Sequence, residues 1–298
     1  MSAVRVSVIV PSWNVRGHLA DCLHSVEAAR SEVERLELIV VDDASDDGSP
    51  ELVARAFPAA RLVRQARNTG FTAAVNRGLL EARGEYVLLL NADAALHPGA
   101  LGRLVAFLAA NPAYAAAAPR LVDERGTTLC TCMRLPRLAT ALWHATPLER
   151  WWPDSRELRR YFARDLDHER DADVEQPPAA CLLVRRALLD ELGGLEPRLA
   201  LYFSDVDFSS RMADRGERTR YLASARASHA VGASTRQRPD RLLTWHRDRL
   251  AYYRIHHGPF GAAWVKLCVL LAAADHLLRQ EARPAPLLRD VASLLAGW

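Results

Sequence analysis

The chain has 298 residues, of which 50% are hydrophobic and 25% are charged, proportions that are typical of a folded globular protein. This composition excludes disordered, collagen-like and integral-membrane proteins, and the length fits one large domain or two small ones. The 39 basic and 36 acidic residues leave a formal net charge of +3, which is too small to indicate a nucleic-acid partner.

The cysteines and the N-terminus predict a compartment. Five cysteines are scattered along the chain, an odd number that predicts no disulfide framework and fits a reducing cytosol. Cys130 and Cys132 form a C-x-C pair without a second pair, so we predict that they alternate across a β-strand rather than hold zinc. The apolar run in residues 1–11 is too short and too interrupted by arginine for a signal peptide. A cytoplasmic protein is therefore expected.

The first third of the chain alternates short apolar runs with segments that carry apolar residues at helical spacing. The predicted strands are residues 4–11, 36–42, 60–64 and 85–90. This alternation predicts a doubly wound α/β fold with a mostly parallel sheet.

In such sheets a ligand binds beyond the carboxyl ends of the strands, so we expect function in the residues that follow each strand. Those residues are 11–14, 42–49, 67–70 and 91–93.

The second half of the chain is less regular. Residues 148–175 mix dense charge with aromatic residues, a pattern that is typical of a variable insert rather than a sheet element. A strand is predicted at residues 179–185, and a helix is predicted to begin near Ser204. Beyond residue 234 the chain is predicted to be helical to its end.

Residues 262–278 are the nearest approach to a membrane segment. Their uninterrupted apolar run, residues 267–274, falls short of the roughly 20 residues that a spanning helix needs. We therefore predict that this helix does not span a membrane. It is either a core helix or an interfacial helix that docks on a bilayer.

An acidic cluster, VVDDASDDGS, follows the second predicted strand. Asp42 and Asp43 are well placed there to accept hydrogen bonds from the imide and ribose hydroxyls of a nucleoside. A plain strand-to-helix loop favours the same residue types, and that alternative stays open.

Asn91 and Asp93 follow the fourth predicted strand in YVLLLNADA. A carboxylate at the end of a strand is what a divalent cation that bridges two phosphates requires. The alternative is an Asx turn that leads into the next helix.

A third group lies in LYFSDVDFSSR. Asp205 at a helix N-terminus is a candidate general base, whereas Asp207 and Arg211 have the spacing of an ion pair within one helix. His229 follows another strand-like stretch and is either a structural histidine or a ligand.

Together these segments resemble glycosyltransferase family 2, and in particular its branch of bacterial rhamnosyltransferases. The resemblance covers residues 4–235 through seven motifs in the family's order. The motifs are VSVIVPSWN, VVDDASDDGS, RNTGFTAAVNRGL, YVLLLNADA, ACLLVRRALLDELGGLEPR, LYFSDVDFSSR and HAVGAS.

The resemblance implies a GT-A fold in one continuous catalytic domain, residues 1–235. Residues 1–120 would bind the nucleotide sugar, and residues 121–235, with an insert at 135–176, would form a fused acceptor-binding half. Residues 236–298 would form a C-terminal helical region, and association with the membrane is one interpretation of it.

The resemblance also assigns roles to individual residues. Pro11 and Asn14 would lie beside the nucleoside, Asp42 or Asp43 would recognise a pyrimidine base, and Arg67 and Asn68 would line the base and diphosphate pocket. Asn91 and Asp93 would complete the donor site, with Mg²⁺ or Mn²⁺ held by Asp93 and His229. Asp205 would be the catalytic base, with Ser204, Asp207 and Arg211 around the acceptor.

The implied reaction is an inverting transfer of a sugar from a nucleoside diphosphate to an acceptor hydroxyl. The branch implies dTDP-rhamnose as donor, with UDP- or GDP-sugars as alternatives, and a glycan or polyprenyl-linked acceptor at the inner face of the cytoplasmic membrane. No nucleic acid is expected to bind.

Two departures and three alternatives accompany this interpretation. Asn91 replaces the first acid of the family's metal motif, and Ser204 replaces the glutamate that usually precedes the base. A degenerate protein that binds a nucleotide sugar without transferring it is therefore the main alternative. A sugar nucleotidyltransferase is disfavoured because the first strand is followed by PSWNVRGHL, without the glycine-rich loop and lysine of that class. The absence of G-x-G-x-x-G there disfavours a dinucleotide oxidoreductase.

Overall fold

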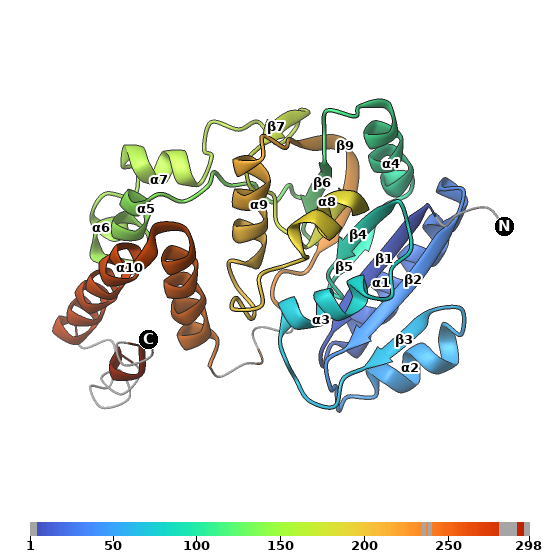
Figure 1. The fold of residues 1–298 in the computed structure, drawn as a ribbon, viewed down its shortest axis with the longest axis horizontal. Coiled ribbons are helices and arrows are strands. Elements are labelled where there is room, and N and C mark those ends of the chain that lie inside the picture. Colours follow the sequence, from blue (N-terminus) through green and yellow to red (C-terminus); the bar gives the residue numbers. More distant parts are fainter. Residues whose placement is uncertain (1–4, 234–236, 238–239, 280–290, 295–298) are drawn as a thin grey trace.

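A computed structural model describes residues 5–233, 237, 240–279 and 291–294 (Figure 1). The strands are β1 Val6–Ser12, β2 Leu36–Asp42, β3 Arg61–Arg64, β4 Tyr86–Leu90, β5 Ala94–Leu96, β6 Ala116–Val122, β7 Ala172–Val174, β8 Cys181–Arg185 and β9 Thr219–His229. The helices are α1 Arg16–Ala28, the short 3₁₀ helix η1 Ala29–Glu32, α2 Ser49–Ala56, α3 Phe71–Leu79, α4 Ala100–Ala110, α5 Leu138–Trp143, α6 Pro147–Trp151, α7 Arg156–Tyr161, α8 Arg186–Leu192, α9 Ser204–Asp214 and α10 Arg241–Leu278.

The strands form one sheet in the order β3-β2-β1-β4-β8-β6-β9-β5, with β7 paired to β9. The first four strands are parallel, and Ser12 at the end of β1 lies opposite Asp42 at the end of β2. This register brings the carboxyl ends of the strands to one edge of the sheet. The parallel sheet predicted from the first third of the sequence is confirmed.

The second half of the sheet is mixed. β8 runs antiparallel to both β4 and β6, whereas β6 and β9 are parallel. β5 is antiparallel to β9 and places Ala94 opposite His229. The short β5 therefore brings the segment after β4 beside the end of β9.

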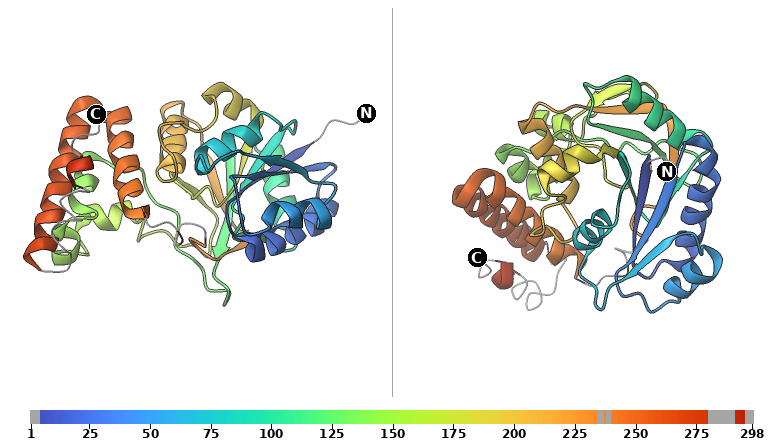
Figure 2. Two further views of the ribbon diagram at one scale, coloured as in Figure 1. Left: turned by 90° about the horizontal axis from the view of Figure 1, so that it is seen from below. Right: turned by 45° about the vertical axis from the view of Figure 1, so that its right-hand side comes forward.

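Helices cover both faces of the sheet, as a doubly wound fold requires (Figures 1 and 2). One core contains buried residues of α1, α2 and α4 against one face of the strands. The other core contains buried residues of α3, α8 and α9 against the opposite face. The central strand β4 is apolar and buried along its whole length because both of its faces are covered.

Two predictions for the middle of the chain are wrong. Residues 172–174, at the end of the predicted insert, form β7 and pair antiparallel with β9, so the insert contributes to the sheet. Cys130 and Cys132 lie in a loop instead of a strand, with Cys130 exposed and Cys132 buried. Alternation between exposed and buried positions at this spacing does not require a strand.

The C-terminal helix α10 has two arms. Gly258 adopts a non-helical conformation at φ 64°, and Pro259, which has no backbone N–H, follows it. The chain turns there, and the two arms lie beside α5 and α6 on the side of the molecule away from β2 and β3 (Figure 2). Buried residues of both arms share a core with Phe203 and Val206.

The second arm of α10 carries an apolar stripe on its exposed face. The stripe consists of Phe260, Ala263, Leu267, Leu270, Leu271, Ala274 and Leu278. Phe260 is 68% exposed and Leu278 is 84% exposed, whereas Val265 and Cys268 on the inner face are buried. By length and composition, α10 is long and apolar enough to cross a membrane. Of its most apolar 18-residue stretch, 28% is buried within the protein. Within residues 262–278, one face of the helix thus packs against the protein core, and the opposite face is apolar and exposed.

The predicted boundary between the catalytic domain and the helical region, at 235/236, falls among residues 234–236, which are outside the described part. Helical structure is confirmed for residues 241–278 and 291–294. The prediction for residues 280–290 and 295–298 also lies outside the described residues.

Candidate active site

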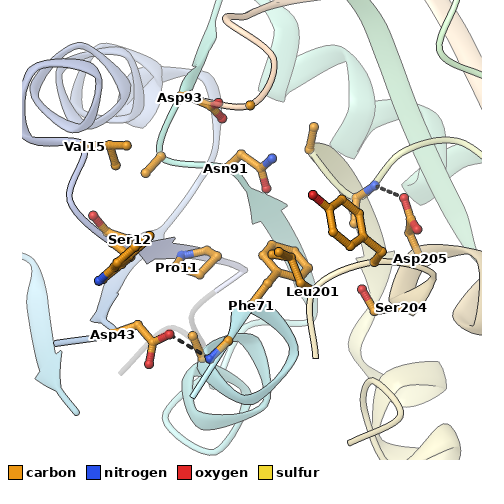
Figure 3. Close-up of a pocket in the computed structure, with 18 of the residues that line it drawn as sticks. Pro11, Ser12, Val15, Asp43, Phe71, Asn91, Asp93, Leu201, Ser204 and Asp205 are labelled. Carbon is orange, nitrogen blue, oxygen red and sulfur yellow. Dashed lines mark hydrogen bonds between the residues drawn. The ribbon is translucent and has the colours of Figure 1, made fainter. Parts of the chain in front are cut away.

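A cavity of about 330 Å³ lies at the carboxyl ends of the parallel strands. Its lining joins segments that are far apart in sequence (Figure 3). The lining residues from the strand ends are Pro11, Ser12, Trp13, Val15, Asp43, Asn68, Gly70, Phe71, Ala74, Asn91, Ala92 and Asp93, and those from the second half are Pro178, Ala179, Ala180, Leu201, Tyr202, Phe203, Ser204, Asp205, His229, Val231 and Gly232. Figure 3 shows Asp43, Asp93 and Asp205 on separate sides of this cavity.

Asp43 holds the loop that precedes α3. Its Oδ1 accepts hydrogen bonds from the Gln65 side chain at 2.7 Å and the Thr69 amide at 2.8 Å, and its Oδ2 accepts one from the Gly70 amide at 2.8 Å. Burial raises the pKa of Asp43, and the amides of Thr69 and Gly70 partly oppose this effect. The carboxylate lines the cavity, but both of its oxygens are engaged by this loop.

Gly70 is where this loop meets the second half of the protein. Its φ is +93°, and an added Cβ would lie 2.6 Å from the carbonyl oxygen of Ala200. The same oxygen accepts a hydrogen bond from the Thr72 amide at 3.2 Å. A side chain at position 70 would push these two segments apart, so the close approach requires glycine.

Three predicted donor residues lie outside the cavity lining. Asn14, at φ 51°, accepts a hydrogen bond from the Asp46 amide at 2.9 Å, so it joins the loops after β1 and β2. Asp42 is buried and accepts a hydrogen bond from the Ser45 amide at 3.1 Å, while its Oδ1 has no partner among the described residues. Arg67 is exposed. Of the predicted donor residues, Pro11, Asp43, Asn68, Asn91 and Asp93 line the cavity.

The structure brings Asp93 and His229 together. The Asp93 Oδ1 lies 3.2 Å from the His229 Nε2, and the Asp93 Oδ2 accepts a hydrogen bond from the Ala233 amide at 3.0 Å. The Asn91 side chain lies 3.5 Å from the same imidazole nitrogen. Burial alone would raise the pKa of Asp93, but the hydrogen bond and charge of His229 more than offset it, and the pKa is lowered. Asp93 is therefore ionised at neutral pH.

This pair fits a divalent cation that takes its remaining ligands from a diphosphate and water. A carboxylate oxygen and an imidazole nitrogen are donors that Mn²⁺ accepts, and the His229 Nδ1 is buried with no partner among the described residues. Within the described residues no group of three or more His, Cys, Asp or Glu side chains that could hold a metal ion occurs.

Asp205 lies on the opposite side of the sheet edge, in the first turn of α9. Its carboxylate accepts hydrogen bonds from the Val206 amide at 2.9 Å and the Ala179 amide at 3.4 Å. Burial raises its pKa, and these two amides oppose the rise only in part. Ser204 and Asp205 both line the cavity, and the helix begins at the predicted residue.

The cavity wall includes backbone strain. Phe203 adopts the left-handed conformation at φ 60° immediately before α9, and the β-branched Val231 does so at φ 41°. Residues other than glycine rarely adopt the left-handed conformation, and those that do are concentrated at functional sites. The surrounding contacts must therefore impose the conformation of this wall.

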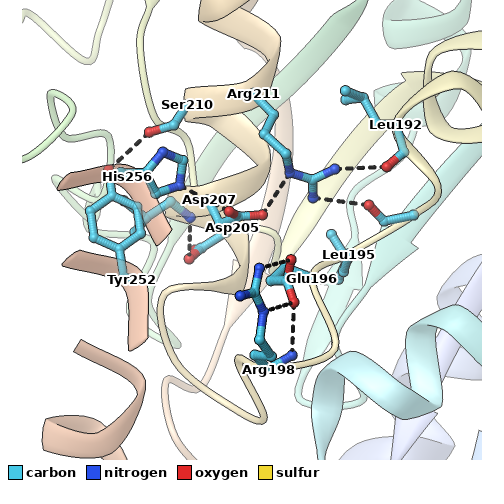
Figure 4. Close-up of polar contacts among 12 residues, drawn as sticks. Leu192, Leu195, Glu196, Arg198, Asp205, Asp207, Ser210, Arg211, Tyr252 and His256 are labelled. Atoms are coloured by element: carbon cyan, nitrogen blue, oxygen red, sulfur yellow. Dashed lines mark hydrogen bonds and ion pairs between the residues drawn. The ribbon is translucent and has the colours of Figure 1, made fainter. Parts of the chain in front are cut away.

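Asp207 and Arg211 are not among the lining residues of the cavity, and they belong to a separate group of polar contacts (Figure 4). The Asp207 side chain is fully buried and accepts hydrogen bonds from the Arg211 Nε at 2.7 Å and the His256 Nε2 at 2.9 Å. The hydroxyl groups of Ser210 and Tyr252 form a hydrogen bond with an oxygen–oxygen distance of 2.9 Å. The ion pair predicted from the spacing is confirmed, and it connects α9 to the first arm of α10.

Asp248 in the same arm holds the loop ahead of α9. Its carboxylate accepts hydrogen bonds from the amides of Ala200 at 3.3 Å, Leu201 at 2.9 Å and Tyr202 at 2.7 Å. It is buried, so these bonds form in a protein interior. Residues of α10 thus position the segment that ends in Asp205.

The sequence analysis did not identify several lining residues, among them Trp13, Phe71, Tyr202 and Val231. Trp13 lies within the selected strand end 11–14 and Phe71 lies just beyond the selected segment 67–70, and their aromatic character was an available signal. Asp248 carried no signal, because an isolated aspartate in a helix is ordinarily a solvated residue.

The fold and this arrangement of carboxylates at the strand ends define a glycosyltransferase of the GT-A type. Residues 7–193 match the family model described as glycosyl transferase family 2. This match covers more than half of the chain, and the chain belongs to that family. The match ends before α9, so Asp205 lies outside it.

The relatives agree with this assignment. The chain is 26% identical over 285 residues to N-acetylglucosaminyl-diphospho-decaprenol L-rhamnosyltransferase of Mycobacterium tuberculosis, which covers 91% of this chain and 92% of the relative. Among solved structures, it resembles the mannosyltransferase PcManGT of Pyrobaculum calidifontis in complex with GDP-Man and Mn²⁺. That match has a TM-score of 0.59 and 21% identity, and covers 100% of this chain and 82% of the other. The chain also resembles S. aureus TarS 1–349 in complex with UDP, with a TM-score of 0.53 and 17% identity. That match covers 98% of this chain and 71% of the TarS chain.

Proposed function

We propose that this family 2 glycosyltransferase transfers a sugar, rhamnose from dTDP-rhamnose, to a hydroxyl of a polyprenyl-linked glycan with inversion at the anomeric carbon. The observation that carries the proposal is the single cavity in which Asp43 and Asp93 of the strand ends face Asp205 of α9. A donor at the strand ends and an acceptor beside α9 would meet in this cavity.

Asp205 is the general base of the proposed reaction. It takes the proton from the acceptor hydroxyl as the oxygen forms its bond to the anomeric carbon and the bond to the nucleoside diphosphate breaks. A raised pKa suits this role, because a base is most effective when its pKa approaches the working pH. A single displacement of this kind inverts the configuration of the anomeric carbon.

Asp93 and His229 are the residues that would hold Mg²⁺ or Mn²⁺. When bound, such a cation neutralises the negative charge that develops on the leaving diphosphate. Asp93 is suited to this role because its lowered pKa keeps it ionised. Asn68 also lines the cavity and would contact the donor.

The choice of substrates rests on the relative from Mycobacterium tuberculosis. Its name specifies transfer of L-rhamnose to a decaprenol-linked N-acetylglucosamine diphosphate, and the similarity extends over 91% of this chain. UDP- and GDP-sugars are the competing donors. A polyprenyl-linked acceptor places the enzyme at the inner face of the cytoplasmic membrane.

A panel of nucleotide sugars, with and without Mn²⁺, tests the donor. We expect dTDP-rhamnose with Mn²⁺ to give the largest rise in melting temperature and to support transfer to a polyprenyl diphosphate N-acetylglucosamine. Binding of a nucleotide sugar without hydrolysis or transfer to any acceptor would instead identify a degenerate binding protein.

The apolar stripe on α10 supports peripheral contact with a membrane. From Phe260 to Leu278 the helix is about 27 Å long, and its exposed face carries apolar side chains over this length. Exposed apolar surface of this extent on one helix face is typical of an interfacial helix.

Flotation with vesicles of phosphatidylethanolamine and phosphatidylglycerol tests this contact. We expect the double variant Leu267→Glu/Leu271→Glu to reduce vesicle binding at least fivefold. Leu80→Glu is the matched control, because Leu80 is 79% exposed at the end of α3 and lies outside the stripe. Equal vesicle binding by the double variant and the control would refute the contact.

A further inference from the structure

A second cavity, of about 710 Å³, lies between the two arms of α10, α6 and the helical turn at residues 291–294. The structure gives it no role in the donor site, because its lining is distinct from the strand ends. The residues that argue for a ligand are Tyr202, Arg150, Arg241, Arg279, Trp245 and Val269.

Tyr202 connects this cavity to the active site. It lines both cavities, and it lies three residues before Asp205 in the loop that Asp248 holds. A molecule in the second cavity therefore ends beside the wall that carries the catalytic base. This is where the part of an acceptor beyond its reacting sugar would lie.

The charges in the lining favour an anion. Arg150, Arg241 and Arg279 line the cavity, against the carboxylates Glu149 and Asp275. Asp275 accepts two hydrogen bonds from Arg150, at 2.8 and 3.0 Å, and lies 3.9 Å from Arg279. No described residue forms an ion pair with Arg241, which stands exposed at the start of α10.

The remaining carboxylate is also engaged. Glu149 accepts hydrogen bonds from the Ala145 amide at 2.8 Å and lies 3.0 Å from the His144 Nδ1. Behind the wall, the buried Arg249 packs over the Trp245 ring at 5.3 Å and donates only to carbonyl oxygens, of Ala141 and His144. One of its Nη atoms has no partner among the described residues. The guanidinium of Arg249 thus adds a second positive charge behind this wall.

The rest of the lining is hydrocarbon. It consists of Pro147, Leu242, Leu243, Val269, Ala272, Ala273, Val291 and Leu294. Burial, together with the nearby Arg249 and His276, lowers the pKa of His246, which also lines the cavity, to about 4. His246 is therefore neutral at pH 7 and adds no charge. An anion bound here would have an apolar group attached to it.

We propose that this cavity binds the diphosphate and the first isoprene units of a polyprenyl diphosphate acceptor, with Arg241 as the contact to the diphosphate. This inference rests on the proposed function, because it places the lipid of the same acceptor. Positive charge beside hydrocarbon matches an isoprenoid diphosphate, and the shared Tyr202 directs its sugar toward Asp205. A free nucleotide would leave the hydrocarbon lining unmatched.

Calorimetric titration of the full chain with farnesyl diphosphate tests the site without any transfer reaction. We expect farnesyl diphosphate to bind at least tenfold more tightly than inorganic diphosphate or farnesol, because each of these satisfies one part of the lining. Equal affinity for inorganic diphosphate would show that the hydrocarbon part takes no role and would overturn the proposal.

Two variants locate the binding. Arg241→Ala should weaken the binding of farnesyl diphosphate at least tenfold. Ala272→Phe should also weaken this binding, because the larger side chain fills the apolar part of the cavity. Arg103→Ala is the matched control, because Arg103 is an exposed arginine of α4 far from this cavity. Melting temperatures within 2 °C of the parent protein would confirm that the variants fold. Unchanged affinity in both folded variants would overturn the site.

Steady-state transfer separates this inference from the proposed function. Arg241→Ala should raise the KM for a polyprenyl diphosphate sugar at least tenfold, with a change of less than twofold in the KM for the nucleotide sugar. Transfer with an unchanged acceptor KM would refute the cavity and leave the proposed function intact. Absence of transfer by the parent protein, with farnesyl diphosphate binding that depends on Arg241, would refute the proposed acceptor reaction and support the cavity.

Discussion

The two walls of the active-site cavity are held in place by different kinds of contact. The strand-end wall, formed by the residues that follow β1, β2 and β4, depends on strand register and on Asp43, which binds the amides of a loop next to it. The helix wall, formed by residues 200–205, depends on Asp248 and on the side chains that join α9 to α10.

In the strand-end wall, Asp43 binds amides that lie 26 and 27 positions away in the chain. The contacts that position the helix wall join residues 42 to 49 positions apart in the chain. They also include Asp207, a buried carboxylate whose loss of partners would cost more than that of an exposed one. The helix wall is therefore the more sensitive of the two to substitutions outside the cavity.

The largest expected effect comes from the helix wall itself. Asp205→Asn removes the proposed base and should lower kcat about 10³-fold, within the range for general-base catalysis. The Kd for the nucleotide sugar, measured by calorimetry, should change less than threefold because the strand-end wall is untouched. Full activity in this variant would eliminate Asp205 as the base.

A variant of Asp248 tests whether α10 holds this wall. Asp248→Ala leaves three amides without their acceptor and should lower the free energy of unfolding by about 3 kcal/mol, measured with urea. Asp123→Ala is the control, since Asp123 accepts the amides of Arg125 and Thr127 in an exposed turn where water replaces it. Equal losses in both variants would contradict the special role of Asp248.

A variant of Gly70 tests the contact between the two walls. Gly70→Ala should destabilise the protein by about 2 kcal/mol, because it combines an unfavourable φ with a Cβ against the Ala200 carbonyl. Gly126→Ala has a similar φ of +81° and no atom within 4 Å of the added Cβ, so it should cost about 1 kcal/mol. The difference between the two variants measures the contact alone.

The smallest expected effect is in the pH profile, where the two walls respond in opposite directions. The pKa of Asp205 is raised and that of Asp93 is lowered, so a fall in pH protonates the base first. The acid limb of kcat/KM should therefore lie above the ordinary range of aspartate, while Mn²⁺-dependent donor binding persists to lower pH. Simultaneous loss of both would show that the two carboxylates titrate together.

The strand-end wall could be predicted from the sequence because its signals are local. Apolar runs that end in Asp43 or Asn91 indicate strands with polar residues at their carboxyl ends, and parallel register brings these residues together. Asp93 and His229 were both selected as candidates, but their contact depends on β5, a three-residue strand that no sequence pattern marked.

The helix wall was predicted only in part. Asp205 and the Asp207–Arg211 pair follow from spacing within one helix, which is a local signal. Asp248, Tyr252 and His256 could not be identified, because their partners are determined by the packing of α10 after its turn at Gly258. Arg67 is an error in the other direction. Its motif predicted a residue of the donor pocket, but in the structure Arg67 is exposed and does not line the cavity.

The attachment of α9 to α10 has a consequence for synthesis on the ribosome. The strands that form the strand-end wall are complete once β4 has emerged, whereas the residues that anchor the segment before Asp205 emerge only after β9. Domains commonly begin to fold from their N-terminal part during translation. A nascent chain that has just completed β9 thus carries the strand-end wall in place, whereas its proposed base stays unanchored until α10 has emerged.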